Sequence, residues 1–299
     1  MSFSASLKTE LSEIPAQSKD DLRALVYGFL LFSKEFLPSS ITAVSDSHTI
    51  ITMISKAISK LTSVRPDITK ISQKNGKSSF KLSVTDGAKD ILAFFGHNGT
   101  EPSRRILREN LKNESCISHF IRGAYLSCGS IADPNKIYRL EFLTLYMNLS
   151  NDLSALLGEY ISPPRSTVRR GVYALYYKES AAIEDLLTYC GAVRSSLEIM
   201  QIKVVKNVRN KINRVTNCET ANISKVVNAA VTINNDIALI LEKKSIEYLS
   251  EDLRELAMLR YNNPEMSIRD LGESLNPPLS RSGVSHRLKR ISEAAKKLR

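Results

Sequence analysis

Hydrogen-bond donors gather at the C-terminal end of this sequence in a pattern that suits contact with a DNA groove. Between Leu279 and Arg299 the only acid is Glu293, whereas basic residues recur throughout. A helix beginning near Ser282 would place apolar residues on one face and donors on the other. Such donors bond base edges and phosphate oxygens. The donors expected to reach bases or the groove rim are Arg281, Ser282, Ser285, His286 and Arg287, and those expected to neutralise phosphates are Lys289, Arg290, Lys296 and Lys297.

The elements that must position these donors precede them directly. Ser250 and Ser267 are suitable N-caps for two helices. Pro277 and Pro278 must end the second helix, because proline cannot continue the helical hydrogen-bond ladder. Two helices followed by a donor-rich third indicate a helix-turn-helix whose turn is longer than usual. The pattern leaves open the alternative of a three-helix bundle with a basic outer face.

A second basic stretch lies earlier in the chain, at residues 202–214, which contain no acid. Such a run is usually a solvated helix face. Contact with the DNA backbone is its functional interpretation. The residues predicted as secondary DNA contacts are Lys203, Lys206 and Lys211, together with Arg169 and Arg170 from a hairpin.

Other reactive residues lack the spacing that catalysis or metal binding requires. The four cysteines and four histidines form no CxxC pair and no metal-ligand grouping. No nucleophile elbow, HExxH motif or dinucleotide fingerprint occurs. Asn75-Gly76-Lys77-Ser78 lacks the first glycine of a P-loop, so a hairpin turn is the better interpretation. We therefore expect reduced, buried cysteines, no metal, no cofactor and no small-molecule substrate.

The composition bounds the class of protein. The chain has 299 residues, of which 42% are hydrophobic and 24% charged, as in a globular protein of two or three domains. Its net charge of +11 favours a polyanionic partner. The longest apolar run, residues 24–32, is far shorter than the ~20 residues of a membrane span. We expect a cytoplasmic, nucleoid-associated protein that binds double-stranded DNA and no membrane.

Glycine spacing indicates an internal duplication. Three glycine pairs share an offset of 95 positions, namely Gly28 with Gly123, Gly76 with Gly171 and Gly96 with Gly191. Glycine stands where backbones approach closely or φ is positive, so the shared offset indicates a repeated backbone geometry. A chance alignment of two similar α/β segments is the alternative.

The apolar pattern predicts the order αββαββα in each copy, and thus an α+β fold with a duplicated saddle. Helices are expected at 21–33, 50–61 and 85–95, with strands at 41–44, 64–71 and 80–84. The second copy is expected to have a helix from 115 through 128, strands around 138–146, a helix at 152–160 and a hairpin about Arg170-Gly171. This domain spans 1–192, with halves at about 18–98 and 115–192. The two helices carrying Gly28 and Gly123 should cross closely.

The rest of the chain is expected to be helical. Residues 193–217 read as a basic linker helix, from Leu197 to Val215, and 218–299 as a helix-turn-helix domain that opens with a longer helix through Ile223 and Ile240. The apolar stripe of that longer helix fits a bundle core or a dimerising seam. We expect a monomer.

Several blocks of the sequence together resemble the WhiA family of bacterial sporulation and cell-division regulators, over essentially the whole chain. The blocks are Ser2-Phe3-Ser4 with Lys8, Glu10 and Leu11; residues 122–134; residues 217–222; and the most specific, residues 277–288. The resemblance implies a LAGLIDADG homing-endonuclease scaffold joined to a C-terminal helix-turn-helix. It also implies a sequence-specific transcriptional regulator of cell division, chromosome segregation and, in sporulating relatives, sporulation.

The resemblance further locates the positions at which active nucleases of that scaffold bind a divalent metal. Aligning residues 26–34 and 121–129 on the nine-residue motif places Ser33 and Cys128 there. Neither is the carboxylate that a hard cation needs. We therefore expect a scaffold that is not an enzyme. The nearby acids, better interpreted as surface charges, are Glu35, Asp133 and Glu141.

The saddle leaves two classes of partner open. It could hold duplex DNA or present a docking surface to transcription or division proteins. The basic residues that would hold DNA are Lys70, Lys74, Lys77, Lys81, Arg139, Arg165, Arg169 and Arg170. The alternatives to a DNA-binding regulator are therefore a metal-dependent endonuclease and an interaction protein of the division machinery.

Overall fold

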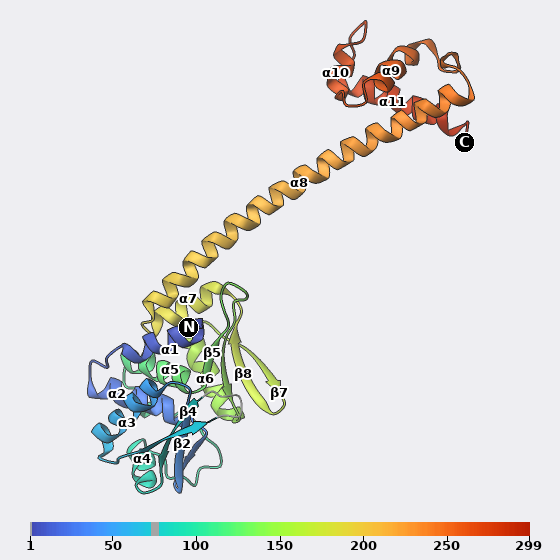
Figure 1. The fold of residues 1–299 in the computed structure, drawn as a ribbon. Coiled ribbons are helices and arrows are strands. Elements are labelled where there is room, and N and C mark those ends of the chain that lie inside the picture. The colour runs from blue at the N-terminus through green and yellow to red at the C-terminus, as the bar shows by residue number, and fades with distance from the viewer. Residues whose placement is uncertain (1, 73–77) are drawn as a thin grey trace. The chain divides into compact units, whose positions relative to one another are not determined.

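The structure, a computed structural model, describes residues 2–72 and 78–299 and divides into two compact units (Figure 1). Unit 1 comprises Met1–Lys206 and combines helices with sheets, whereas unit 2, Asn207–Arg299, is helical. Across the described ranges, no helix combines the length and the apolar character that crossing a bilayer requires. The expected turn at Asn75-Gly76 lies outside the described residues.

The first copy in unit 1 begins with a helix whose start is fixed by a capping box. The Ser18 hydroxyl accepts a hydrogen bond from the Asp21 N–H (3.0 Å), and the Asp21 carboxylate accepts one from the Ser18 N–H (3.1 Å). The elements of this copy are α2 (Lys19–Leu31), β1 (Glu35–Leu37), β2 (Ser40–Ser45), α3 (His48–Thr62), β3 (Asp67–Ser72), β4 (Ser78–Val84) and α4 (Ala88–Phe94). Its strands form an antiparallel sheet in the order β1-β2-β4-β3.

The second copy repeats this arrangement. Its elements are α5 (Glu114–Cys128), β5 (Gly129–Ile131), β6 (Leu140–Thr144), α6 (Met147–Tyr160), β7 (Arg165–Arg169), β8 (Val172–Tyr177) and α7 (Ser180–Tyr189). The sheet order, β5-β6-β8-β7, is the order of the first sheet. The predicted αββαββα order is thereby confirmed in both copies. The short strands β1 and β5 lie outside the predicted strand ranges, because three residues are too few to show a period.

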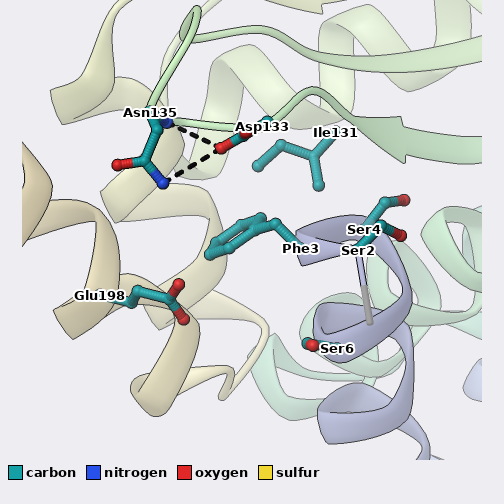
Figure 2. A pocket seen from close by; sticks show the side chains of 8 residues that line it. All are labelled: Ser2, Phe3, Ser4, Ser6, Ile131, Asp133, Asn135 and Glu198. Atoms are coloured by element: carbon teal, nitrogen blue, oxygen red, sulfur yellow. Dashed lines mark hydrogen bonds between the residues drawn. The ribbon is translucent and has the colours of Figure 1, made fainter.

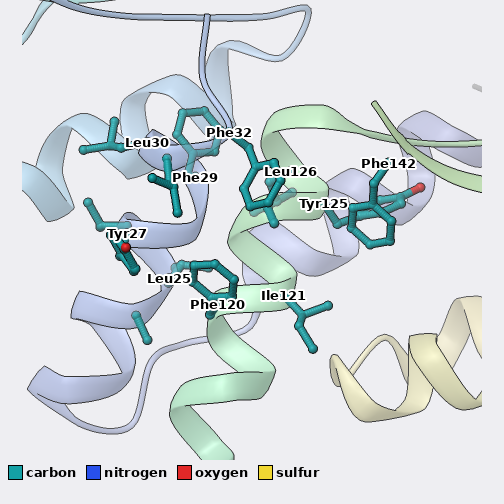
Figure 3. Close-up of a cluster of buried hydrophobic side chains, with 14 of the residues drawn as sticks. Leu25, Tyr27, Phe29, Leu30, Phe32, Phe120, Ile121, Tyr125, Leu126 and Phe142 are labelled. Carbon is teal, nitrogen blue, oxygen red and sulfur yellow. The ribbon is translucent and has the colours of Figure 1, made fainter. Parts of the chain in front are cut away.

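The two central helices, α2 and α5, pack face to face, as the glycine offset predicts (Figure 3). A Cβ added to Gly28 would overlap the carbonyl oxygen of Phe120, and one added to Gly123 would overlap that of Leu25. The clashes are reciprocal, so the close approach requires glycine on both helices. Tyr27 and Phe120 pack beside the crossing with ring centroids 5.5 Å apart.

Each copy closes with a helix that ends in a left-handed glycine. Gly96 follows α4 with φ of 83°, and Gly191 follows α7 with φ of 84°. In both, the glycine N–H and the next N–H bond carbonyls of the last turn. This shared helix end explains why Gly96 and Gly191 recur at the offset of 95 positions. Gly171 also has a positive φ of 79°, and its counterpart Gly76 lies outside the described residues.

Two elements that precede α8 (Val193–Lys243) lie outside the copies and were not predicted from the sequence. They are α1 (Phe3–Glu13) and the 3₁₀ turn η1 (Arg108–Asn110). Helix α1 buries Leu7 and Leu11 and contacts α3, α5 and β5. Glu10 accepts hydrogen bonds from the backbone N–H groups of Arg194 (2.7 Å) and Ser195 (3.0 Å). Glu10 of α1 therefore caps the start of α8, the helix that follows α7.

One helix, α8 (Val193–Lys243), replaces the two that the pattern indicates. The expected break between 215 and 223 is absent because no proline or glycine interrupts residues 193–243. The division between the units falls within this helix. Ile199 joins the core of unit 1, whereas Ile237 and Ile240 join that of unit 2.

Unit 2 continues with short helices around its own core. They are η2 (Ile246–Tyr248), α9 (Glu251–Asn262), α10 (Ile268–Glu273) and α11 (Arg281–Lys296). Ser267 caps α10 as expected, accepting from the Asp270 N–H (3.2 Å). Ser250 precedes α9 as expected, but its hydroxyl donates to the carboxylate of Asp252 (2.6 Å) instead of capping backbone N–H groups.

All four cysteines are free thiols, but they are not all buried. Cys116 and Cys190 are buried and Cys128 is half-buried. Cys218 is exposed on α8, so the expectation of burial was wrong there. The neighbouring residues of α8, 207–229, are all exposed as well, so no other part of the described structure packs over this thiol.

Candidate nucleic-acid interface

Helix α11 is fixed on one side by the core of unit 2. Ser280 caps it by accepting from the Gly283 N–H (3.2 Å). Val284, Leu288, Ile291 and Ala295, at helical spacing, are all buried. The residues between them must therefore face outward.

The outward residues include nearly all of the predicted DNA contacts. Arg287 is half-buried. The exposed residues are Arg281, Ser282, Ser285, His286, Lys289, Arg290, Lys296 and Lys297. The hydroxyl of Ser285 donates to the carbonyl oxygen of Arg281 (2.9 Å), and that of Ser282 lies 3.0 Å from Ser280 Oγ. Within the described residues, the side chains of Arg281, His286 and Lys289 have no partner.

Two of the predicted contacts are held inside unit 2. Arg287 Nη1 donates to the carbonyl oxygen of Asp252 (2.8 Å), and Arg290 Nη1 bonds the Asp252 carboxylate (2.6 Å). The hydrogen bond from Ser250, followed by the charge of Arg290, holds the pKa of Asp252 below its ordinary value. These bonds join the outer side of α11 to the first turn of α9. The local sequence around Asp252 carries no signal for this role, because the partners of Asp252 lie far along the chain.

Two further residues that the sequence analysis missed shape the turns of unit 2. Buried Arg260 donates through Nη1 to the carbonyl oxygens of Pro264 (3.1 Å) and Met266 (2.7 Å), which fixes the connection from α9 to α10. A Cβ on Gly272 would overlap the carbonyl oxygen of Leu279. Gly272 therefore allows α10 to approach the segment that leads into α11.

The ends of α2 and α5 carry the two positions that the resemblance aligns with metal ligands. The Ser33 Oγ lies 2.6 Å from the carbonyl oxygen of Leu30 and 2.9 Å from that of Glu35, so its single proton is shared between these backbone acceptors. Burial raises the pKa of the Cys128 thiol to about 12, which keeps it protonated near neutral pH. A hydroxyl donor and a neutral thiol are poor ligands for Mg²⁺ or Ca²⁺.

A protein cation lies at each of these helix ends. Arg104 Nη1 donates to the carbonyl oxygens of Ser33 (2.9 Å) and Leu31 (3.4 Å) at the end of α2. Lys8 Nζ, from α1, donates to the carbonyl oxygen of Leu126 (3.5 Å) near the end of α5. Burial lowers the pKa of both groups. Positive charge at a helix C-terminus complements the helix dipole, so these side chains occupy the electrostatic role of a bound cation.

The hollow between these helix ends does not fit a divalent cation. It has a volume of about 420 Å³, and its lining residues include Ser33, Lys34 and Cys128 but no carboxylate. Nor do the described residues contain any group of three or more His, Cys, Asp or Glu side chains able to hold a metal.

The three acids considered as substitute ligands lie elsewhere. Glu35 accepts from the Ser40 hydroxyl (3.1 Å), and Glu141 pairs with Arg139 (2.8 Å). Asp133 lines a separate hollow of about 340 Å³ beside the start of α1, where its carboxylate accepts from Asn135 (Figure 2). None of them lines the hollow at Ser33 and Cys128.

Two of the basic residues considered on the saddle lie on opposite faces of the first sheet. Lys81 pairs in register with Thr69, whereas Lys70 pairs with Phe80. Successive strand residues face opposite sides, so Lys70 and Lys81 lie on different faces of their sheet. Lys70 and Lys81 therefore cannot both contact a duplex on one face of the first sheet. Lys74 and Lys77 lie outside the described residues.

The second sheet carries one half-buried arginine and several exposed ones. Arg139 is neutralised by Glu141 and lies over the Tyr176 ring at 4.6 Å. Arg165 pairs with Glu179 at 3.3 Å. Arg169 and Arg170 are exposed at the β7–β8 turn, where Arg170 has a φ of 50°.

Of the predicted secondary DNA contacts on α8, two bind other parts of unit 1 and one is exposed. Lys203 pairs with Glu184 at 3.3 Å, and Lys206 donates to the carbonyl oxygen of Pro134 (2.7 Å). Both therefore serve the attachment of α8 to the rest of unit 1. Lys211 is exposed.

The comparisons with known proteins agree with this architecture. The WhiA LAGLIDADG-like domain matches residues 117–209, and the WhiA C-terminal HTH domain matches residues 212–295. A "Probable cell division protein WhiA" from Clostridium novyi is 34% identical over 313 residues, covering 100% of this chain and 99% of that protein.

Two solved structures are also similar. The full-length DUF199/WhiA protein from Thermatoga maritima shares 25% identity, with a TM-score of 0.59, over 99% of each chain. The N-terminal LAGLIDADG domain of DUF199/WhiA has a TM-score of 0.54 over 67% of this chain and 96% of that chain, at 21% identity. The resemblance and the fold class inferred from the sequence are confirmed. The chain therefore belongs to the WhiA family.

Proposed function

We propose that this protein is a sequence-specific regulator of transcription that binds double-stranded DNA through α11 and does not cleave it. One observation carries the proposal. The outer face of α11 presents Arg281, His286 and Lys289 to solvent without partners among the described residues, while its inner face is fixed in the core of unit 2. A helix fits the major groove, and donors on a rigid helix lose little freedom on binding.

The regulated genes are proposed to be those of cell division and chromosome segregation, and of sporulation in relatives that sporulate. The name of the Clostridium relative supports the connection with division. Such a protein would work in the cytoplasm, at the nucleoid, as a monomer.

The absence of catalysis in this proposal rests on the chemistry at the ends of α2 and α5. Ser33 and Cys128 supply no carboxylate, and Arg104 and Lys8 already place positive charge there. The endonuclease alternative would need two carboxylate-held metals at this point.

A second role, docking of transcription or division proteins on unit 1, is favoured by the composition of the sheets. The outward register of the first sheet combines Lys81 with exposed Val44 and Asp67, which gives a mixed surface instead of a basic one. DNA-binding surfaces are far more basic.

The experiment that tests the proposal starts from genomic duplex fragments selected by the full chain. Binding of a selected and a scrambled duplex is measured by fluorescence anisotropy across a salt series, with Mg²⁺ present, and the same samples are then run on a gel. The proposal expects selective, salt-sensitive binding of uncut DNA. Arg281→Ala should lower affinity for the selected duplex by about 1–3 kcal/mol, whereas Lys296→Ala should weaken both duplexes alike. Equal binding of the two duplexes, or cut DNA, would contradict it.

A further inference from the structure

The middle of α8 carries an apolar stripe that nothing in the described structure covers. Residues 207–229 are exposed without exception. Val208, Ile212 and Val215 recur at helical spacing, and Ile223 and Val226 continue the row after Glu219, which occupies the intervening position. Each of these five apolar residues has between 50% and 63% of its surface in water. Soluble monomers rarely leave so long an aliphatic row exposed, and such rows mark interaction sites.

The charges beside this stripe favour one kind of partner. Arg209 and Lys211 flank Val208 and Ile212, and Arg214 and Lys225 add further positive charge. Against these four bases, residues 207–229 offer one acid, Glu219. None of the four basic side chains is paired in the described structure.

A second molecule of the same chain does not fit this surface. A parallel partner would place Arg209 and Lys211 beside their own counterparts, and an antiparallel one would offer a single carboxylate to four bases. Like charges at the flanks of a helical seam oppose pairing. A DNA backbone would satisfy the bases but would leave the aliphatic side chains uncovered.

We propose that the exposed face of α8 between Val208 and Val226 docks an amphipathic helix of a partner protein, with an aliphatic stripe flanked by Asp and Glu. The partner stripe would pack against Val208, Ile212, Val215, Ile223 and Val226, as in helix-to-helix recognition. Its carboxylates would pair with Arg209 and Lys211, which sets orientation and selects against basic helices. This site is independent of α11, so the proposed DNA binding can fail or succeed separately.

The probe is a labelled synthetic helix of about four heptads with Leu and Ile at the seam and Glu on both flanks. A matched peptide carries Lys in place of every Glu. Both are titrated with the full chain and followed by fluorescence anisotropy. The acidic peptide should bind in the micromolar range, more weakly as salt rises, and the basic peptide should not bind.

Matched variants locate the site. Ile212→Asp with Val226→Asp should weaken binding at least about tenfold, as loss of central apolar contacts does. Asn210→Asp with Asn228→Asp is the control. Asn210 lies two residues from Ile212 and Asn228 two residues from Val226, so both lie about half a turn around the helix from the apolar stripe. The control adds the same charge and should bind as the wild type does.

Arg209→Gln with Lys211→Gln tests the charges without touching the apolar stripe, and should lower affinity for the acidic peptide and flatten its salt dependence. Helix content is compared by circular dichroism. Equal binding of the acidic and basic peptides, no binding of either, or unchanged affinity in the Ile212 and Val226 variant would overturn the proposal. So would a dimer in analytical ultracentrifugation that Ile212→Asp dissociates, because the stripe would then be occupied by a second molecule.

Discussion

Arg290 and Asp252 form an ion pair of 2.6 Å that joins the outer side of α11 to the first turn of α9. Arg287 adds a bond to the carbonyl oxygen of the same aspartate. Two donors that the sequence assigns to DNA therefore also have a structural role. The free donors Arg281, His286 and Lys289 are left as the better candidates for contacts with bases.

Replacing Asp252 by Asn should separate these two roles. Because the pair is partly exposed, its loss should lower the unfolding free energy only slightly, measured by urea denaturation. Removing a negative charge beside the basic face should strengthen binding to all duplexes alike. Glu293→Gln makes the same change in charge without breaking an ion pair. It should strengthen DNA binding as Asp252→Asn does but leave the unfolding free energy unchanged. Weaker DNA binding by Asp252→Asn would instead mean that Arg290 needs this partner to reach DNA.

Restoring carboxylates at the ends of α2 and α5 should not by itself restore a metal site. In Ser33→Asp with Cys128→Asp, Arg104 and Lys8 should pair with the new carboxylates. Adding Lys8→Ala and Arg104→Ala should then raise Mn²⁺ affinity by at least about tenfold, measured by electron paramagnetic resonance. Equal Mn²⁺ affinity with and without the two cations would show that they do not replace the metal.

The crossing of α2 and α5 should not tolerate a methyl group. Gly28→Ala would overlap the backbone of α5, where no side-chain rotation can relieve the clash. We expect a loss of about 3 kcal/mol, the upper end for overpacking, in thermal unfolding followed by circular dichroism. Gly158→Ala is the control, since its Cβ would make only ordinary contacts with Pro163. It should leave stability unchanged or raise it by up to about 1 kcal/mol.

Stability should fall on mild acidification. Burial lowers the pKa of His97 below its ordinary 6.5, and the Tyr27 hydroxyl lies 3.0 Å from its Nε2. The unfolded chain then takes up a proton at a higher pH than the folded chain does. The contribution of the neutral imidazole is complete above about pH 6.5 and is lost as pH falls toward the folded pKa.

The urea midpoint should accordingly drop between about pH 7.5 and 5.5, and less steeply in His97→Asn than in the wild type. Glu101 opposes the shift and Arg104 reinforces it. His119, whose pKa burial also lowers, would supply the slope that remains. An unchanged slope in His97→Asn would assign the whole effect to other groups.

Two kinds of sequence signal predicted parts of the fold. The repeated glycines Gly28 and Gly123 indicated the duplication and the reciprocal backbone contacts between the central helices, and Ser267 caps a helix within three residues of itself. The apolar period of α11 likewise placed its buried face. Caps and apolar periods lie within a few positions along the chain, and the glycine pair is visible because a duplication repeats it at a fixed offset.

The partners of charged residues were not predictable in the same way. Arg104 and Lys8 reach helix ends from segments outside both helices, and Asp252 holds arginines from a helix further along the chain. Such pairs depend on the assembled fold. Lys70 and Lys81 lie on opposite faces of their sheet because of the strand register, and composition alone does not reveal that register.

The measurement that tests the central claim most directly compares charge reversal at two places on one selected duplex. Arg281→Glu with Lys289→Glu alters the outer face of α11, whereas Arg169→Glu with Arg170→Glu makes the same change in charge at the β7–β8 turn. Fluorescence anisotropy should show that the α11 variant loses selective binding while the hairpin variant keeps it. Selective binding that survives reversal on α11 but is lost at the hairpin would assign DNA recognition to unit 1 and contradict this account.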